Sequence, residues 1–144
     1  MMHSKLNYHG IEKVALERFP ELAGPVEQTF GSYYDLKTET PEAYPIFESV
    51  LQEFVVKLLE ANDNDSLIRR MFNFFEEMAS SEDVNVVNLL WIAILKPLLS
   101  RPEHVRSAWK QMGERTKEVS REIAQFEGWQ DNLPRGQGSP GNGH

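Results

Sequence analysis

The chain has 144 residues, no cysteine and a formal net charge of −7, which suits one domain without disulfides or thiolate metal sites. Residues 1–65 carry 5 basic and 12 acidic side chains and residues 66–144 carry 10 of each, so the negative excess lies in the first half. An acidic surface repels phosphate backbones, which argues against nucleic-acid binding and favours either a basic partner or simple solubility.

The start of the chain, residues 1–13, is polar and has no apolar run of the kind found in secretory signals. The longest unbroken apolar run is Leu89–Leu95, whereas a helix needs about 20 apolar residues to span a bilayer. We therefore expect a cytoplasmic protein that does not contact membranes. The lack of cysteine fits a reducing compartment.

The first predicted helix covers Ile11–Leu22, and Pro20 and then Gly24-Pro25 interrupt it. A loop-rich region, residues 24–44, follows and contains two adjacent tyrosines. A second helix is predicted from Thr40 or Pro41, because Thr can cap a helix and Pro suits the first helical position. Its apolar residues recur at spacings of three and four, and the Asn-Asp turn at 62–65 ends it.

A third helix is predicted over Ser66–Met78, and a fourth covers Asn85–Leu99 after the polar turn at 80–83. The fourth is apolar on every side, so we expect other helices to cover it completely as the spine of the core. Pro97 should kink it or mark its last turn. The side chains of Asn85 and Asn88 are expected to bond to neighbouring loops.

Ser100 to Glu103 reads as a capping box that starts a long fifth helix ending near Phe126. Every seventh residue is apolar, which predicts a face packed on another helix; the residues are Val105, Met112, Val119 and Phe126. Gly113 should cost this helix about 1 kcal/mol relative to Ala. Basic residues alternate with glutamates, which is typical of a solvated face; the basic ones are Arg106, Lys110, Lys117 and Arg121.

These elements predict an all-α fold, either a five-helix bundle or a short HEAT-like stack of antiparallel helix pairs. Residues 1–126 form the single helical domain. Residues 127–144 have the Gly, Pro and Ser content of a flexible tail. No pattern of period two indicates a strand.

No catalytic, metal or cofactor motif is present in the sequence. The four histidines have none of the spacings of zinc or di-iron helices, and neither a glycine-rich phosphate loop nor a nucleophile elbow occurs. Glu76, beside three phenylalanines, is either a surface acid or a carboxylate drawn toward the apolar face. We therefore expect a protein that is not an enzyme and that uses no cofactor.

Four segments carry a resemblance to a known family: Phe19-Pro20-Glu21-Leu22, Phe74-Phe75-Glu76-Glu77, the turn Ser80-Ser81-Glu82-Asp83, and Val87-Asn88-Leu89-Leu90. Over about residues 11–126 the chain resembles small helical immunity proteins of bacterial polymorphic toxins. The resemblance implies a non-catalytic protein that binds a cognate toxin domain in the cytoplasm and blocks it. The charged fifth helix and the tail do not belong to the pattern, so no contact is carried over to them.

Many toxin domains act on nucleic acids or nucleotides and have basic clefts, which an acidic loop would fill. We expect the partner-binding residues in the loop after the first helix, where tyrosines supply contact area and acids supply steering; they are Tyr33, Tyr34, Asp35, Glu39 and Glu42. The alternative for the two tyrosines is that one ring closes the core and the other has no role.

Two other functions remain open. A helical adaptor or homodimer would pair through the face of the fifth helix, although we expect a monomer rather than a dimer. An enzyme would need a deep pocket that contains Glu76 and a histidine.

Overall fold

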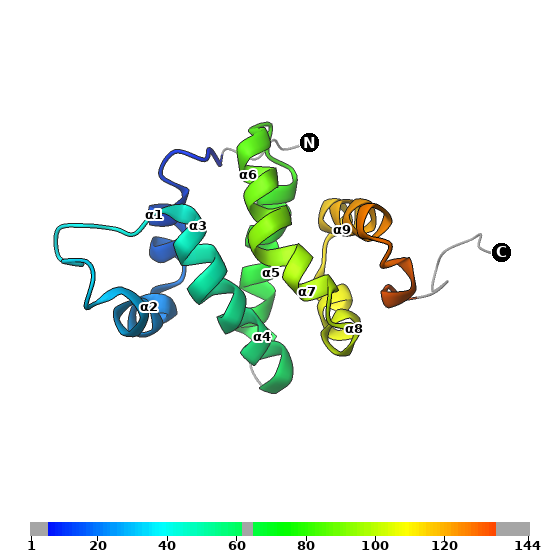
Figure 1. Cartoon of the computed structure of the whole chain (residues 1–144), viewed down its shortest axis with the longest axis horizontal. Helices are drawn as coiled ribbons and strands as arrows, with labels where there is room; N and C mark the ends of the chain where they lie inside the picture. The colour runs from blue at the N-terminus through cyan, green and yellow to red at the C-terminus, as the bar shows by residue number, and fades with distance from the viewer. Residues whose placement is uncertain (1–5, 62–64, 135–144) are drawn as a thin grey trace.

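A computed structural model describes residues 6–61 and 65–134 of the chain. These residues are mainly helical and include no β-strand, which confirms the predicted all-α fold. Long helical segments form the centre of the molecule, and shorter helices flank them at both ends (Figure 1).

One end of the molecule is built by α1 (Ile11–Arg18), the 3₁₀ turn η1 (Pro20–Leu22) and α2 (Ala23–Phe30). The prediction of one helix over Ile11–Leu22 is wrong at Phe19, which has non-helical angles (φ −127°, ψ 75°) because the following proline disfavours the helical region. The prediction that Gly24-Pro25 starts a loop is also wrong. Pro25 lies in the first turn of α2, where its missing N–H has no partner to lose.

The centre consists of three antiparallel segments (Figure 1). The first is α3 (Ala43–Ile46), η2 (Phe47–Leu51) and α4 (Gln52–Ala61); the second is α5 (Asp65–Ala79); the third is α6 (Val84–Leu89), η3 (Leu90–Leu95) and α7 (Lys96–Leu99). The first segment begins later than predicted, with Glu42 rather than Thr40 or Pro41 in the N-cap position. The π-helical turns η2 and η3 pack against each other.

The other end contains α8 (Pro102–Gln111), α9 (Glu114–Glu127) and the 3₁₀ turn η4 (Gln130–Asn132). The predicted fifth helix is therefore broken at Gly113. The predicted capping box does not form, because Arg101 takes the N-cap position and the Ser100 hydroxyl donates to the Pro97 carbonyl at 2.7 Å. Phe126 is 79 % exposed, so it does not belong to the packing face that Val119 joins.

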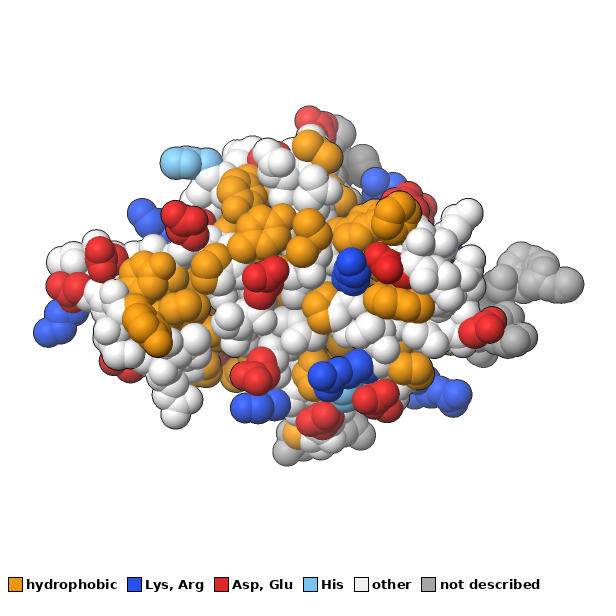
Figure 2. All heavy atoms as spheres, in the orientation of Figure 1, with side chains coloured by type: hydrophobic (Ala, Val, Ile, Leu, Met, Phe, Trp, Pro, Cys, Tyr) orange, Lys and Arg blue, Asp and Glu red, His pale blue; other side chains and the backbone are white. Residues whose placement is uncertain are grey.

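The third central segment is the spine of the core, but it is not covered on all sides. Ile94 and Leu95 are fully buried, as predicted. Val84 and Ile92 are 65 % and 47 % exposed on the outer side of the same helix, so complete cover was a wrong expectation. Figure 2 shows the hydrophobic side chains gathered over α6 and η3. The predicted role of Asn85 and Asn88 in bonding neighbouring loops does not fit their exposed positions.

The chain continues in ordered form past the predicted domain end at residue 126. Gly128 adopts a left-handed conformation (φ 79°) that ends α9 and reverses the chain. Trp129 and Leu133 then pack against the core. The rest of the predicted flexible tail, residues 135–144, lies outside the described residues, as do residues 62–64 of the predicted Asn-Asp turn.

Candidate partner-binding surface

The loop 31–42, which carries the five predicted partner-binding residues, is folded by its own hydrogen bonds. The amides of Tyr33 and Tyr34 donate to the Phe30 carbonyl at 2.9 and 3.0 Å, which continues the last turn of α2. The amides of Thr38 and Glu39 donate to the Asp35 carbonyl at 2.9 and 2.7 Å. The loop is thus a pair of turns with a defined shape.

Two of the predicted acids support this loop. Glu39 Oε1 accepts from the Asp35 amide at 2.9 Å, and Asp35 Oδ1 accepts from the Lys37 amide at 3.2 Å. Both side chains are exposed, and each carboxylate accepts a hydrogen bond from a backbone amide of the loop itself. Glu42 is also exposed, and within residues 6–61 and 65–134 its carboxylate forms no hydrogen bond or ion pair. Glu42 is therefore the predicted acid most available to a partner.

The two tyrosines have different environments. Tyr34 is half-buried and packs edge-on against Phe30, with ring centroids 5.8 Å apart and an interplanar angle of 89°. Tyr33 is 80 % exposed, the largest exposed fraction among the large hydrophobic side chains of the described chain. One ring therefore closes the core, as the alternative reading expected, and the other stands in solvent.

Sequence reasoning missed a second pair of tyrosines beside the loop. The rings of Tyr8 and Tyr44 lie 6.3 Å apart, at the start of α1 and in α3. Burial, followed by the nearby charges of Glu12 and Glu42, raises the pKa of Tyr8. Burial, followed by Tyr8 and Glu48, raises the pKa of Tyr44. Acidic side chains therefore surround two neutral phenols at this end of the molecule.

The position of Tyr8 has no signal in the sequence, because a contact distant in sequence creates it. Its amide donates to Asp83 Oδ2 at 2.8 Å, and the Ser81 hydroxyl donates to the Leu6 carbonyl at 2.9 Å. These bonds attach the N-terminal segment to the turn between α5 and α6. We call the loop 31–42 together with Tyr8, Tyr44 and Glu48 the acidic tyrosine surface.

A hollow of about 270 Å³ lies beneath this loop, between α1, α2 and the segment 36–41. Its lining is mostly apolar and includes two glutamates; the residues are Leu16, Ala23, Val26, Glu27, Leu36, Glu39, Thr40 and Pro41. This volume is below the roughly 300–1,000 Å³ of most small-molecule sites. The hollow therefore suits a single side chain of a protein partner better than a substrate.

Glu76, the residue that an enzyme was expected to use, has a structural task. One carboxylate oxygen accepts from the Arg115 amide at 2.9 Å, and the other accepts from the Thr116 amide and hydroxyl at 2.9 and 2.7 Å. Glu76 thus caps the first turn of α9 from another helix. The buried histidine, His104, contacts Glu60 instead, with Nε2 and Oε2 3.0 Å apart.

The described part of the chain has neither a metal-binding cluster nor a membrane-spanning helix. No group of three or more His, Asp or Glu side chains is arranged to hold a metal ion there. Over the same residues, every helix is too short or too polar to cross a bilayer.

The fold and this surface define an all-helical domain with a shaped, tyrosine-bearing loop at one end. Residues 13–128 match the model of the family described as "Domain of unknown function (DUF7674)", and the chain belongs to that family. A comparison with curated proteins and a comparison with solved structures each gave no match. The resemblance to toxin immunity proteins therefore stays a prediction.

Proposed function

We propose that this protein is a non-catalytic immunity protein that binds a cognate toxin domain and blocks it. The observation that carries the proposal is Tyr33, which stands 80 % exposed on a loop that its own hydrogen bonds hold in shape. A tyrosine on a rigid loop gives a large contact area and loses little conformational entropy on binding. Tyrosine is also among the residue types that are enriched at the energetic centres of protein interfaces.

The charges around the loop support a basic partner. Glu42 and Glu48 are exposed beside the two neutral phenols of Tyr8 and Tyr44, and the first half of the chain carries the whole negative excess. Opposite charge speeds the encounter of two proteins and fixes their orientation. A toxin domain with a cleft for nucleic acid or nucleotides has the complementary charge.

The experiment first tests whether a toxin-like reading frame lies immediately upstream of this gene, and then measures binding of the purified toxin domain by surface plasmon resonance. Tyr33→Ala should raise Kd by about 30-fold, the effect of a central contact residue. Glu42→Lys should mainly slow association, and the effect should shrink as salt increases. Glu122→Lys is the matched control, because Glu122 is an exposed glutamate on α9 at the other end of the molecule.

Charge reversal at Asp35 or Glu39 is a poorer test, because each carboxylate accepts a hydrogen bond that shapes the loop. A loss of affinity in such a variant could result either from the reversed charge or from a changed loop conformation. Full affinity in both Tyr33→Ala and Glu42→Lys would exclude the acidic tyrosine surface as the contact. Loss of affinity in Glu122→Lys alone would move the contact to α9.

A helical adaptor without a toxin partner is the second candidate. Exposed apolar side chains favour it, since Ile92 and Phe126 are 47 % and 79 % exposed. Pairing through the fifth-helix face is not available, because Val119 and Ile123 are buried within the chain. A stable dimer in light scattering that Phe126→Ser converts to monomer would support this candidate; a monomer at all concentrations would count against self-association.

A further inference from the structure

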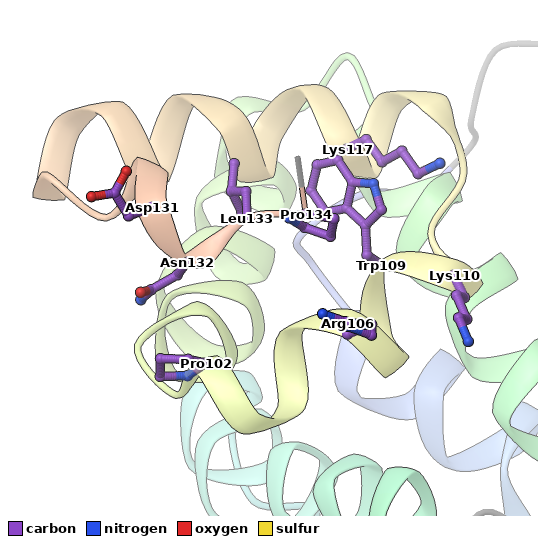
Figure 3. Close-up of a pocket in the computed structure, with 9 residues that line it drawn as sticks. All are labelled: Pro102, Arg106, Trp109, Lys110, Lys117, Asp131, Asn132, Leu133 and Pro134. Carbon is purple, nitrogen blue, oxygen red and sulfur yellow. The ribbon is translucent and has the colours of Figure 1, made fainter. Parts of the chain in front are cut away.

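A large hollow lies at the other end of the molecule from the acidic tyrosine surface. Its volume is about 860 Å³, and it opens between α8, α9 and the segment after α9 (Figure 3). Its lining combines cations, one large aromatic ring and a polar end; the residues are Pro102, Arg106, Trp109, Lys110, Lys117, Asp131, Asn132, Leu133 and Pro134. We call it the α8–α9 pocket.

The wall made by residues 129–134 is held in place by hydrogen bonds. The Trp129 amide donates to the Ala124 carbonyl at 2.7 Å, and the Leu133 amide donates to the Gln130 carbonyl at 3.1 Å. The Asn132 side-chain amide donates to the Leu99 carbonyl at 2.9 Å, which ties the segment to the end of α7. The pocket is therefore a built feature of the fold.

The cations of the pocket lack acidic partners. Glutamates alternate with this basic row in the sequence, but Glu118 pairs with Arg115 at 2.6 Å rather than with a cation of the pocket. Over the described chain, Arg106, Lys110 and Lys117 form no ion pair. In a protein with a net charge of −7, three unpaired cations around one hollow are a local reversal of charge.

The indole of Trp109 completes this basic end. Lys117 Nζ lies 5.6 Å and Arg121 Cζ lies 5.5 Å from its ring centroid, both on α9. Such cation–π contacts hold the ring and both charges in a fixed relation. Trp109 is half-buried and lines the pocket, so part of its surface remains open to a ligand.

Hydrogen-bond acceptors and cations lie at different ends of the pocket. In Figure 3, Asp131 and Asn132 lie at one end, Trp109 and Lys110 lie toward the other, and Leu133 and Pro134 lie between. Asn132 uses its amide nitrogen on Leu99, so its carbonyl oxygen is left as an acceptor at the same end of the pocket as Asp131. A matching ligand has an anionic group, a planar ring and hydrogen-bond donors.

We propose that the α8–α9 pocket binds a nucleoside phosphate. The base lies against Trp109, the phosphate meets a cation beside that ring, among Arg106, Lys110 and Lys117, and an amino or hydroxyl group donates to the acceptors at the far end. The volume is within the range of small-molecule sites. The site is independent of the proposed toxin contact, because it lies on other helices.

A free nucleotide fits better than a nucleic-acid strand. The pocket offers one aromatic ring, whereas proteins that bind single strands stack successive bases along a basic groove. The negative charge of the rest of the chain also opposes a long polyanion. The two sources share one chemistry, so the test compares them directly.

The test measures binding to the full chain by isothermal titration calorimetry, with AMP, GMP, adenosine and inorganic phosphate as separate probes. We expect a nucleoside monophosphate to bind with a Kd of about 1 mM or lower, and adenosine or inorganic phosphate alone to bind at least about tenfold more weakly. A single-stranded DNA decamer should bind no more tightly than the mononucleotide. Tighter decamer binding would overturn the proposal in favour of nucleic acid.

Variants locate the site. The triple substitution Arg106→Gln, Lys110→Gln and Lys117→Gln should weaken AMP binding by at least about tenfold, since charge-assisted contacts are lost. Trp109→Leu should weaken AMP binding more than phosphate binding, because the base loses the ring against which it stacks. Lys13→Gln, an exposed lysine on α1, is the matched control and should change neither. Circular dichroism confirms that each variant is folded.

Two results would overturn the proposal. One is the absence of heat with AMP and GMP at millimolar concentration. The other is AMP binding that persists unchanged in the folded triple variant, which would place the nucleotide elsewhere. Trp109→Leu with full AMP affinity would exclude stacking on the indole.

Discussion

Two stretches of this chain look alike in sequence as single long helices, yet only one is continuous. Val84–Leu99 contains a proline near its end and runs unbroken through α6, η3 and α7. Pro102–Glu127 has no proline after its first residue and breaks into α8 and α9. The comparison shows that proline content alone does not decide where a helix breaks. A break also requires hydrogen-bond partners for the backbone amides and carbonyls that it frees, and a neighbouring helix can supply them.

In the continuous stretch, a wider turn precedes the proline. The Lys96 amide donates to the Trp91 carbonyl, five residues back, as in a π-helix. Pro97 follows at once in the first turn of α7, where the widened register lowers the cost of its missing N–H. Burial of Ile94 and Leu95 holds this turn in the core.

In the broken stretch, an external acid stabilises a new helix start. Met112 has an extended backbone (ψ 140°), and Gly113 follows with φ −80° and ψ 179°. Glycine has no side chain to cap α9, so the carboxylate of Glu76 on α5 accepts from the Arg115 and Thr116 amides. The glycine leaves room for it, because a Cβ there would lie 2.5 Å from the Glu76 carboxylate.

The largest effect expected concerns the buried side of the continuous stretch. Leu95→Ala should lower the free energy of unfolding by about 3 kcal/mol, because a fully buried leucine leaves a cavity. Ile92→Ala, on the exposed side of the same turn, should cost less than about 1 kcal/mol. Urea unfolding followed by circular dichroism measures both; equal losses would contradict the division into a buried and an exposed side.

The next effect concerns the cap of the broken stretch. Glu76→Ala should lower the free energy of unfolding by about 2 kcal/mol, because two amides and a hydroxyl lose their acceptor. Glu76→Gln keeps an acceptor and should cost less. Glu77→Ala is the matched control and should cost under about 1 kcal/mol, since it removes only an exposed ion pair with Arg18.

A third substitution reverses a prediction made from the sequence. Gly113→Ala would stabilise a continuous helix by about 1 kcal/mol, but here it should destabilise the protein by about that amount because the new Cβ displaces Glu76. In a Glu76→Ala background the same substitution should be neutral or stabilising. Urea denaturation of the four proteins in this double-mutant cycle measures the coupling, and additive effects would rule out the proposed contact.

The smallest effect concerns the proline. Pro97→Ala should change the free energy of unfolding by less than about 1 kcal/mol, because the π turn already accommodates the proline. Thermal and urea unfolding both report this change. A gain approaching the roughly 3 kcal/mol of a proline inside an ordinary helix would mean that Pro97 strains the spine.

Much of the fold could be predicted from the spacing of apolar residues in the sequence. Val105, Met112 and Val119 are buried on the packing face that their spacing predicted, and the all-α class follows from the same kind of pattern. Element ends were less accessible. The first helix ends before Phe19, because Pro20 disfavours helical angles in the residue before it. Pro25 is common both in turns and in the first turn of a helix, so the sequence alone did not decide between these two structures.

The candidate site was predicted only in part. Tyr33 and Glu42 are exposed as an interface requires, but Asp35 and Glu39 are used by the loop itself. The contributions of Tyr8 and of Glu76 arise from contacts distant in sequence, which no local pattern encodes. The solvated face predicted for the basic row is present, since Arg106, Lys110 and Arg121 are exposed, but helical spacing does not decide which glutamate a cation meets.

Because the cap on α9 comes from α5, the start of α9 depends on α5 during folding. Glu76 precedes the amides that it serves by 39 and 40 residues, so the start of α9 has its acceptor only after α5 has reached its place. During synthesis α5 leaves the ribosome before α9 does. Until α9 has been made, the Glu76 carboxylate lacks the two amides that it accepts from in the folded protein. We therefore expect α9 to fold onto the domain after α5 is in place. A peptide of residues 114–134 alone should show little helicity.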